Sequence, residues 1–255
     1  MGHETMPAFR LSLLRGFELR TGREVVPLIS SAQRLVAFLA LQGRPLGRSY
    51  VAEMLWPETT SIRASANLRS SLWRAQRSCG PLIRVSAQCL ALSRGVVVDL
   101  QVVSARAHRL LTGEHPHEED IGVDLRADLC ADLLVDWYDD WVLVERERYH
   151  QLRLHALEVI CSRLTDAGRY GEAVDAGLAA IRAEPLRESA HRALIETYLA
   201  EGNHWEAVRQ YELFRRLLLD ELGLEPSAAL VGLVPAARSP AGAPHRGRRA
   251  YSHAR

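Results

Sequence analysis

Residues 63–77 read RASANLRSSLWRAQR, and this stretch decides how the first half of the chain is interpreted. On a helical projection at about 100° per residue, small and apolar side chains fall on one stripe and polar side chains on the opposite face. The stripe consists of Ala64, Leu68, Leu72 and Ala75, and the opposite face carries Arg63, Asn67, Ser70, Arg74 and Arg77. No Asp or Glu occurs between Glu58 and Asp99, so this helix forgoes the i,i+4 ion pairs of an ordinary solvated helix. A face of one charge is better explained by an anionic partner.

The surrounding segments predict a small domain of strands and helices. Residues 9–28 read as a short antiparallel meander, and SSAQRLVAFLALQ at 30–42 predicts a helix with a serine N-cap, ended by Gly43. Further helices are predicted at 48–56 and 62–79, then a hairpin over 82–92 and a strand at 96–100. This order is typical of a winged helix-turn-helix domain, in which the hairpin is the wing. The alternative is a small α+β domain with no role on DNA.

The polar face offers side chains that DNA recognition uses. Arg pairs with guanine, Asn pairs with adenine, and Ser bonds to a base or a phosphate. Because residues near the start of a recognition helix usually touch base edges, we predict base contacts by Arg63, Asn67 and Ser70 and phosphate contacts by Arg74 and Arg77. Four flanking residues are predicted to contact DNA as well: Arg48 and Thr60 before the helix, and Arg84 and Gln88 on the wing. Trp73 is expected either to pack on the duplex backbone or to pack on the second domain, and we favour the structural packing role.

A repeat appears in the second half of the chain. GRYGEAV at 168–174 and GNHWEAV at 202–208 are 34 residues apart, and Ala156 with Ala190 and Leu164 with Tyr198 keep the same offset. A period of about 34 residues, with Gly in the turn and Ala in the following helix, is typical of tetratricopeptide repeats. We therefore predict an all-α domain of helical hairpins that bury their apolar faces by stacking.

Charge divides the 255-residue chain in the same way. Residues 1–110 contain 15 Arg and 6 acidic residues, whereas residues 111–230 contain 12 Arg and 25 acidic residues, and every basic residue is Arg. Opposite charges indicate two domains with different partners. We predict a winged-helix DNA-binding domain at 1–104, an all-α domain at 105–230 and a disordered basic tail at 231–255.

Other classes of protein lack their signals. The four cysteines are scattered and form no C-x-x-C pair, and His115 and His117 are interpreted as loop residues, so we expect no disulfide framework, metal or cofactor. No apolar run is long enough for a membrane span, and the first ten residues lack a signal-peptide stretch. No nucleophile elbow, HExxH motif or phosphate loop is present, so we expect no enzyme. The expected location is the cytoplasm, at the nucleoid.

Four stretches carry a resemblance to a known family. They are AQRLVAFLALQGRPLGRSYVAEMLWP at 32–57, ASANLRSSLWRAQR at 64–77, WVLVERERYHQLRLHALE at 141–158 and the segment from 166 to 227. The chain resembles the antibiotic regulatory protein (SARP) family of bacterial transcriptional activators. The resemblance implies an OmpR-type winged helix joined to a bacterial transcriptional activator domain of tetratricopeptide-like repeats.

The same resemblance implies a function and its partners. These are binding to double-stranded DNA at direct repeats near a promoter, contact with RNA polymerase, pairing of two copies on DNA, and control of a secondary-metabolite gene cluster. One departure is Gly47, where the family usually has Ser or Thr before the second helix; glycine still caps a helix, so we expect a weaker start. The competing interpretation is a protein-interaction scaffold whose basic domain binds polyanions with low sequence specificity.

Overall fold

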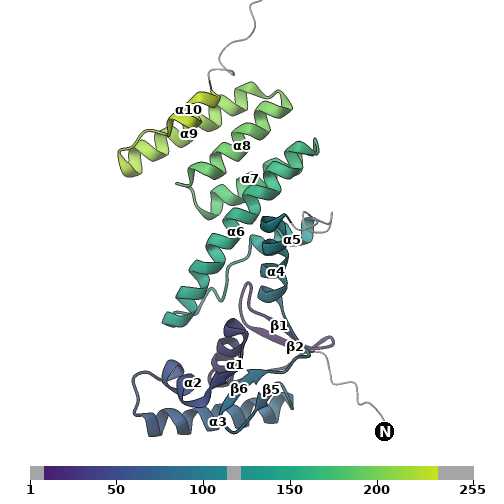
Figure 1. Ribbon diagram of the computed structural model, residues 1–255, viewed down its shortest axis with the longest axis vertical. Helices are drawn as coiled ribbons and strands as arrows, with labels where there is room; N and C mark the ends of the chain where they lie inside the picture. Colours follow the sequence, from purple (N-terminus) through teal and green to yellow (C-terminus); the bar gives the residue numbers. More distant parts are fainter. Residues whose placement is uncertain (1–8, 114–121, 235–255) are drawn as a thin grey trace, which may run out of the picture. The chain divides into compact units, whose positions relative to one another are not determined.

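The computed structural model describes residues 9–113 and 122–234. Within them the protein is mostly helical, with a small β region near the N-terminus (Figure 1). The chain divides into two compact units, Met1–Ala156 and Leu157–Arg255. No helix in the described ranges is both long and apolar enough to cross a membrane. His115 and His117 lie outside the described residues, as does the predicted basic tail from residue 235 onward.

The first unit opens with the predicted meander. Strands β1 (Phe9–Ser12), β2 (Glu18–Thr21) and β3 (Glu24–Val25) are antiparallel neighbours, with Leu11 opposite Leu19. Strand β7 (Val96–Val98) pairs in parallel with β1, so the sheet has the order β3-β2-β1-β7. The strand predicted at 96–100 ends at Val98 because Asp99 begins the next helix.

Three helices form the centre of this unit. They are α1 (Ser30–Gln42), α2 (Arg48–Leu55) and α3 (Ser61–Cys79), and α3 packs on both of the others. The predicted serine N-cap of α1 is wrong: Ile29 occupies the cap position and offers no side-chain acceptor. The side chain of Gln33 instead donates to Leu28 O at 2.8 Å, which ties the first turn to the preceding chain.

A second sheet follows α3. Strands β5 (Ile83–Val85) and β6 (Cys89–Leu92) form the predicted hairpin, and Leu82, Ile83 and Leu90 are buried beneath it. The two-residue strand β4 (Leu46–Gly47), which lies just before α2, pairs with β6. Sequence reasoning did not anticipate β4, because two residues carry no alternation pattern. This strand fixes the hairpin beside the start of α2.

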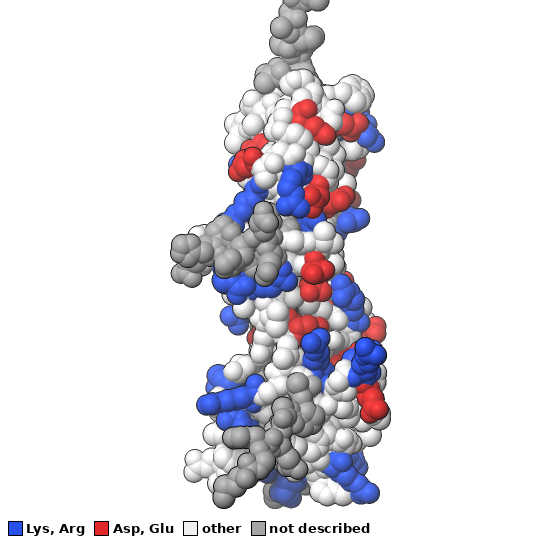
Figure 2. Space-filling view, turned by 90° about the vertical axis from the view of Figure 1, so that its right-hand side faces the viewer, with Lys and Arg blue, Asp and Glu red and all other residues white. Residues whose placement is uncertain are grey.

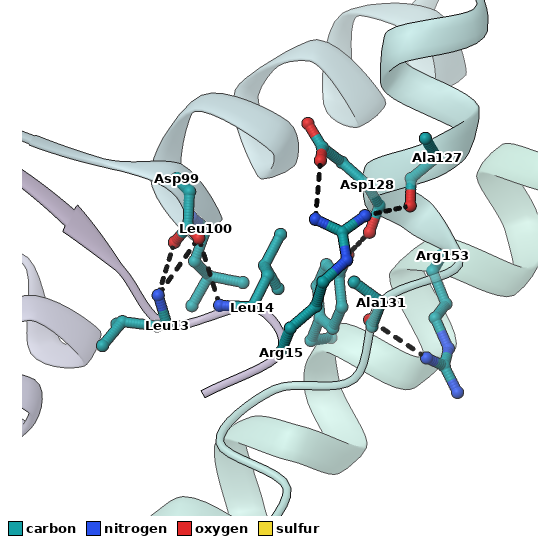
Figure 3. A network of polar contacts seen from close by, with 10 residues as sticks. Leu13, Leu14, Arg15, Asp99, Leu100, Ala127, Asp128, Ala131 and Arg153 are labelled. Carbon is teal, nitrogen blue, oxygen red and sulfur yellow. Dashed lines mark hydrogen bonds and ion pairs between the residues drawn. The ribbon is translucent and has the colours of Figure 1, made fainter. Parts of the chain in front are cut away.

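The far end of β1 is held by polar contacts with the segments after β7 (Figure 3). Helix α4 (Asp99–Thr112) begins with a carboxylate that accepts from the backbone N–H of Leu13 at 2.9 Å and of Leu14 at 3.1 Å. Burial raises the pKa of Asp99 above its ordinary value, although these N–H donors act in the opposite direction. Arg15 donates to Ala127 O at 2.9 Å in α5 (Val123–Leu129). The end of β1 is therefore tied to two helices by charged groups.

The loop before the long helix α6 (Asp140–Asp166) depends on one arginine. Arg146 donates to the carbonyl oxygens of Leu133 at 3.0 Å, Leu134 at 2.5 Å and Trp137 at 2.9 Å. Leu134 has a φ of 43°, in the left-handed region that a leucine rarely adopts. Three charge-assisted hydrogen bonds hold this strained turn in place.

In the described part of the second unit, residues 157–234, every regular element is a helix. The end of α6 is followed by α7 (Tyr170–Ala183), α8 (Glu188–Glu201), α9 (His204–Leu222) and α10 (Ala228–Leu233). Helix α8 contacts α7, α9 and α10. Residues 34 apart occupy matching places: Gly168 and Gly202 both have positive φ before a helix, and Ala173 and Ala207 are both buried.

Small side chains let the helices of this unit approach closely. A Cβ added at Gly177 in α7 would lie 3.3 Å from Cys161 Sγ and 3.3 Å from Leu194 Cβ. A methyl group at this position would therefore be tightly packed on two sides. At Gly171, in the first turn of the same helix, an added Cβ would meet no atom within 4 Å.

A buried histidine joins α8 to α9. The ring of His191 stacks on Phe214 with 4.2 Å between centroids. Its Nε2 lies 2.9 Å from Pro185 O, and its Nδ1 lies 2.8 Å from Nε2 of Gln210. These partners fit a neutral ring that donates through Nε2 and accepts through Nδ1. Burial lowers the pKa of His191 below its ordinary value.

Candidate nucleic-acid interface

Helix α3 is amphipathic as predicted. The stripe Ala64, Leu68, Leu72 and Ala75 is buried. Thr60 is the N-cap, and its hydroxyl accepts from the backbone N–H of Arg63 at 3.4 Å. Cys79, the last residue of the helix, is also buried, and burial raises the pKa of its thiol to about 11. This cysteine is therefore a packing residue in the neutral thiol form.

The opposite face of α3 presents the predicted polar residues to solvent. Arg63, Ser70, Arg74 and Arg77 are exposed, and Asn67 is half-buried. Among residues 9–113 and 122–234, Arg63 and Arg74 make no ion pair. Figure 2 shows blue Arg side chains at the lower end of the molecule, the end that carries α3 in Figure 1. The face therefore carries positive charge that no acidic side chain neutralises.

A hollow lies beside this face, where α2, α3 and the hairpin meet. It has a volume of about 450 Å³, and it is lined by Gly47, Arg48, Ser49, Ser65, Leu68, Arg69, Ala87 and Gln88. The backbone N–H of Arg48 donates to Gln88 O at 3.0 Å, which fixes the hairpin turn against the start of α2. Gly47 is the N-cap of α2 in an extended conformation, as expected, with no side-chain cap.

The structure brings some predicted residues together and separates others. Arg48 and Gln88, predicted from different segments, line one hollow with Arg69, which sequence reasoning missed. Arg84 lies on β5, where its Nε donates to Leu92 O at 3.4 Å within the hairpin. Arg69 lies between the apolar stripe and the polar face on the helical projection. The neighbouring hairpin, and not the pattern along α3, gives Arg69 its place.

The packing role expected for Trp73 is wrong. The indole is 58% exposed, because its position on α3 is too far from the apolar stripe to reach the core. Its contact is with Arg77, whose guanidinium carbon lies 5.2 Å from the centre of the ring. Ile62, which lies on the same outer side of α3, is 82% exposed. The outer face is therefore broader than predicted and includes large apolar side chains.

Within residues 9–113 and 122–234, no group of three His, Cys, Asp or Glu side chains is placed to hold a metal ion.

Comparison with known proteins finds a matching domain model and similar regulatory proteins. Residues 124–236 match the family model of the bacterial transcriptional activator domain. The chain is 30% identical over 236 residues to regulatory protein AfsR of Streptomyces coelicolor and 25% identical over 241 residues to AfsR of Streptomyces griseus. These matches cover 89% and 90% of the chain but 24% of each relative, so the chain spans about a quarter of their length.

One solved structure has a similar fold. It is Mycobacterium tuberculosis EmbR in complex with a low affinity phosphopeptide, with a TM-score of 0.68 and 20% sequence identity. The match covers 90% of this chain and 65% of that one. The domain match points to a regulator of transcription. The domain match and the AfsR relatives show similarity to SARP-type transcriptional regulators, and the likeness to EmbR shows a shared fold.

Proposed function

We propose that the chain is a sequence-specific DNA-binding transcriptional activator with a winged helix-turn-helix domain at residues 1–104. In this proposal α2 and α3 are the helix-turn-helix, α3 enters the major groove, and the β5–β6 hairpin is the wing. The observation that carries the proposal is the outer face of α3. There, exposed arginines have no acidic partner among the described residues, and the segment from residue 59 to residue 98 contains no acid.

The residues divide by their distance from the start of α3. Arg63, Asn67 and Ser70 lie in its first three turns, where recognition helices read base edges, so they are proposed to contact bases. Arg74 and Arg77 lie in the second half and are proposed to contact phosphates.

Residues that flank α3 would hold the opposite strand of the DNA duplex. The hollow that contains Arg48, Arg69 and Gln88 is open, polar and basic, which suits a phosphate of the DNA backbone. Arg84 on β5 is proposed as a contact of the wing. The hydroxyl oxygen of Thr60 already caps α3. Thr60 would therefore contact the backbone of DNA either with the same hydroxyl, through its O–H group, or with its own backbone N–H.

The remainder of the chain is proposed to act on transcription. The matched activator domain and the spacing of 34 residues support tetratricopeptide-like repeats in a domain at 105–230, after a DNA-binding domain at 1–104. As the resemblance to the SARP family implies, the chain is proposed to act in the cytoplasm on a secondary-metabolite gene cluster, and its similarity to the regulatory protein AfsR agrees with a regulatory role. Its partners would be direct repeats near a promoter, RNA polymerase and a second copy of the chain on DNA.

A protein-interaction scaffold is the alternative, and one observation favours it. The outer side of α9 exposes Trp205 at 74% and Leu213 at 50% of their surfaces, and such side chains are enriched where proteins meet. In that case the basic face of α3 would bind any polyanion.

The affinity for two DNA duplexes separates these proposals. One duplex is selected by the chain from a random library, and the other is an unselected duplex of equal length. We expect the selected duplex to bind at least about a thousandfold more tightly at moderate salt, because specific affinities exceed non-specific ones by that factor or more. Equal affinities would contradict the activator and support the scaffold.

A further inference from the structure

We infer that Trp73 is a positioning residue that holds the guanidinium of Arg77 ready for a DNA phosphate; the inference rests on the function proposed above. The two residues are one helical turn apart on α3, and the guanidinium carbon lies 5.2 Å from the centre of the indole ring. A cation within about 6 Å of the ring face is attracted by its electron density, most strongly by tryptophan.

Three arginines elsewhere in the chain are held by carboxylates instead. Arg187 is held by Glu158 at 2.6 Å, Arg215 by Glu225 at 2.7 Å, and Arg169 by Glu172 at 2.7 Å. Each of these carboxylates neutralises the arginine that it orders. At Arg77 an aromatic ring replaces the carboxylate, and no ion pair of Arg77 is present in the described ranges.

An aromatic ring in place of a carboxylate favours the binding of an anionic partner. A carboxylate next to Arg77 would repel a phosphate and compete for the guanidinium N–H groups. The indole restricts the movement of the Arg77 side chain. It does not remove the positive charge, and it leaves the N–H groups in the plane of the guanidinium available to donate. Arginine loses side-chain entropy when it binds, so an arginine that is already confined binds a phosphate at lower cost.

The position of Trp73 agrees with this role. The ring is 58% exposed, on the side of α3 that also carries Arg69 and Ile62. A large apolar side chain that is this exposed contributes little to the hydrophobic core. It is explained if the outer side of α3 is covered when DNA is bound.

The experiment is a double-mutant cycle of Trp73→Ala, Arg77→Ala and the combination. The affinity for the unselected duplex is measured from 50 to 200 mM salt, because one phosphate contact contributes about 0.9 to the slope of log affinity against log salt and changes affinity about 3.5-fold over this range. Trp205→Ala is the control for the loss of an exposed tryptophan. Thermal unfolding shows that each variant is folded.

We expect Trp73→Ala to lower the salt slope in the same direction as Arg77→Ala, with no further loss in the double variant. Trp73→Phe, which keeps a ring, should recover most of the slope. Additive losses, or an unchanged slope in Trp73→Ala, would overturn the inference while leaving DNA binding intact. A wild-type chain that binds neither the selected nor the unselected duplex would overturn the proposed function itself.

Discussion

Replacement of Arg63 by alanine tests whether the face of α3 reads sequence or only binds charge. Arg63 is exposed and makes no ion pair within the described residues, and its contact with Thr60 is made by the backbone N–H. The side chain therefore contributes little to the fold, and we expect a change in the free energy of unfolding below about 0.5 kcal/mol. Any larger effect of the variant would come from the complex with DNA.

The expected effect on DNA follows from the kind of contact. A base contact by arginine is worth about 1–3 kcal/mol, so the affinity for the selected duplex should fall roughly 5- to 150-fold. The affinity for the unselected duplex should fall only by the loss of one positive charge. The discrimination between the two duplexes therefore decreases, and the preference for one base pair of the site is relaxed.

Arg77→Ala is the matched comparison on the same helix. A phosphate contact carries no sequence information, so this variant should weaken both duplexes by the same factor and lower the salt slope by about 0.9. Fluorescence anisotropy with both duplexes at several salt concentrations measures these quantities. If Arg63→Ala and Arg77→Ala change the two affinities in the same way, the division of α3 into base-reading and phosphate-binding residues is wrong.

Three further predictions concern the stability of the folded chain. Gly177→Ala should destabilise the second unit by about 1–2 kcal/mol because the new methyl group overpacks two neighbours. Gly171→Ala, the control, should stabilise the unit by up to about 1 kcal/mol. Equal changes in thermal unfolding would refute the packing argument. Arg146→Ala should lower the free energy of unfolding, measured by urea titration, by roughly 3 kcal/mol because it removes three charge-assisted hydrogen bonds. The side chain of Arg148 is 78% exposed, so Arg148→Ala should lower it by less than about 0.5 kcal/mol in the same titration. The pKa of His191 is lowered in the folded state, so the unfolded chain takes up a proton at a higher pH than the folded chain does. The free energy of unfolding should therefore be at its full value above about pH 6.5 and decrease as the pH falls below that value. A His191→Leu variant with the same pH dependence as the wild type would contradict this.

Much of the fold around α3 was predictable because it follows from periodicity. The apolar stripe at intervals of three and four residues gave both the helix and its buried side, and Ala64 and Leu68 are buried as that stripe requires. The spacing of 34 residues likewise located Gly168 and Gly202 in equivalent turns.

The features that were missed depend on contacts between distant segments. Ser30 was predicted as the cap of α1 from its residue type alone, but the chain enters the helix one residue earlier, at Ile29. Strand β4 exists because β6, more than forty residues later, pairs with it. Arg69 belongs to the candidate site because the hairpin turn at Gln88 lies across the same hollow.

Trp73 was misplaced for a different reason. Large aromatic residues are usually core residues, and that tendency favoured packing. The helical projection already placed Trp73 outside the apolar stripe, and the exposed ring follows from that geometry. The contact with Arg77, one turn along the helix, could have been found from the i,i+4 spacing alone.

The central claim, that α3 enters the major groove, is tested most directly by photo-crosslinking. A benzophenone amino acid replaces Ala66, which is exposed on the outer side of α3, or Ala200, which is exposed on α8. Both variants are irradiated on the selected duplex, and the crosslinked bases are mapped. The account predicts crosslinks to bases within the selected site from position 66 and none from position 200. Crosslinks from position 200 alone, or equal crosslinking from both positions, would contradict it.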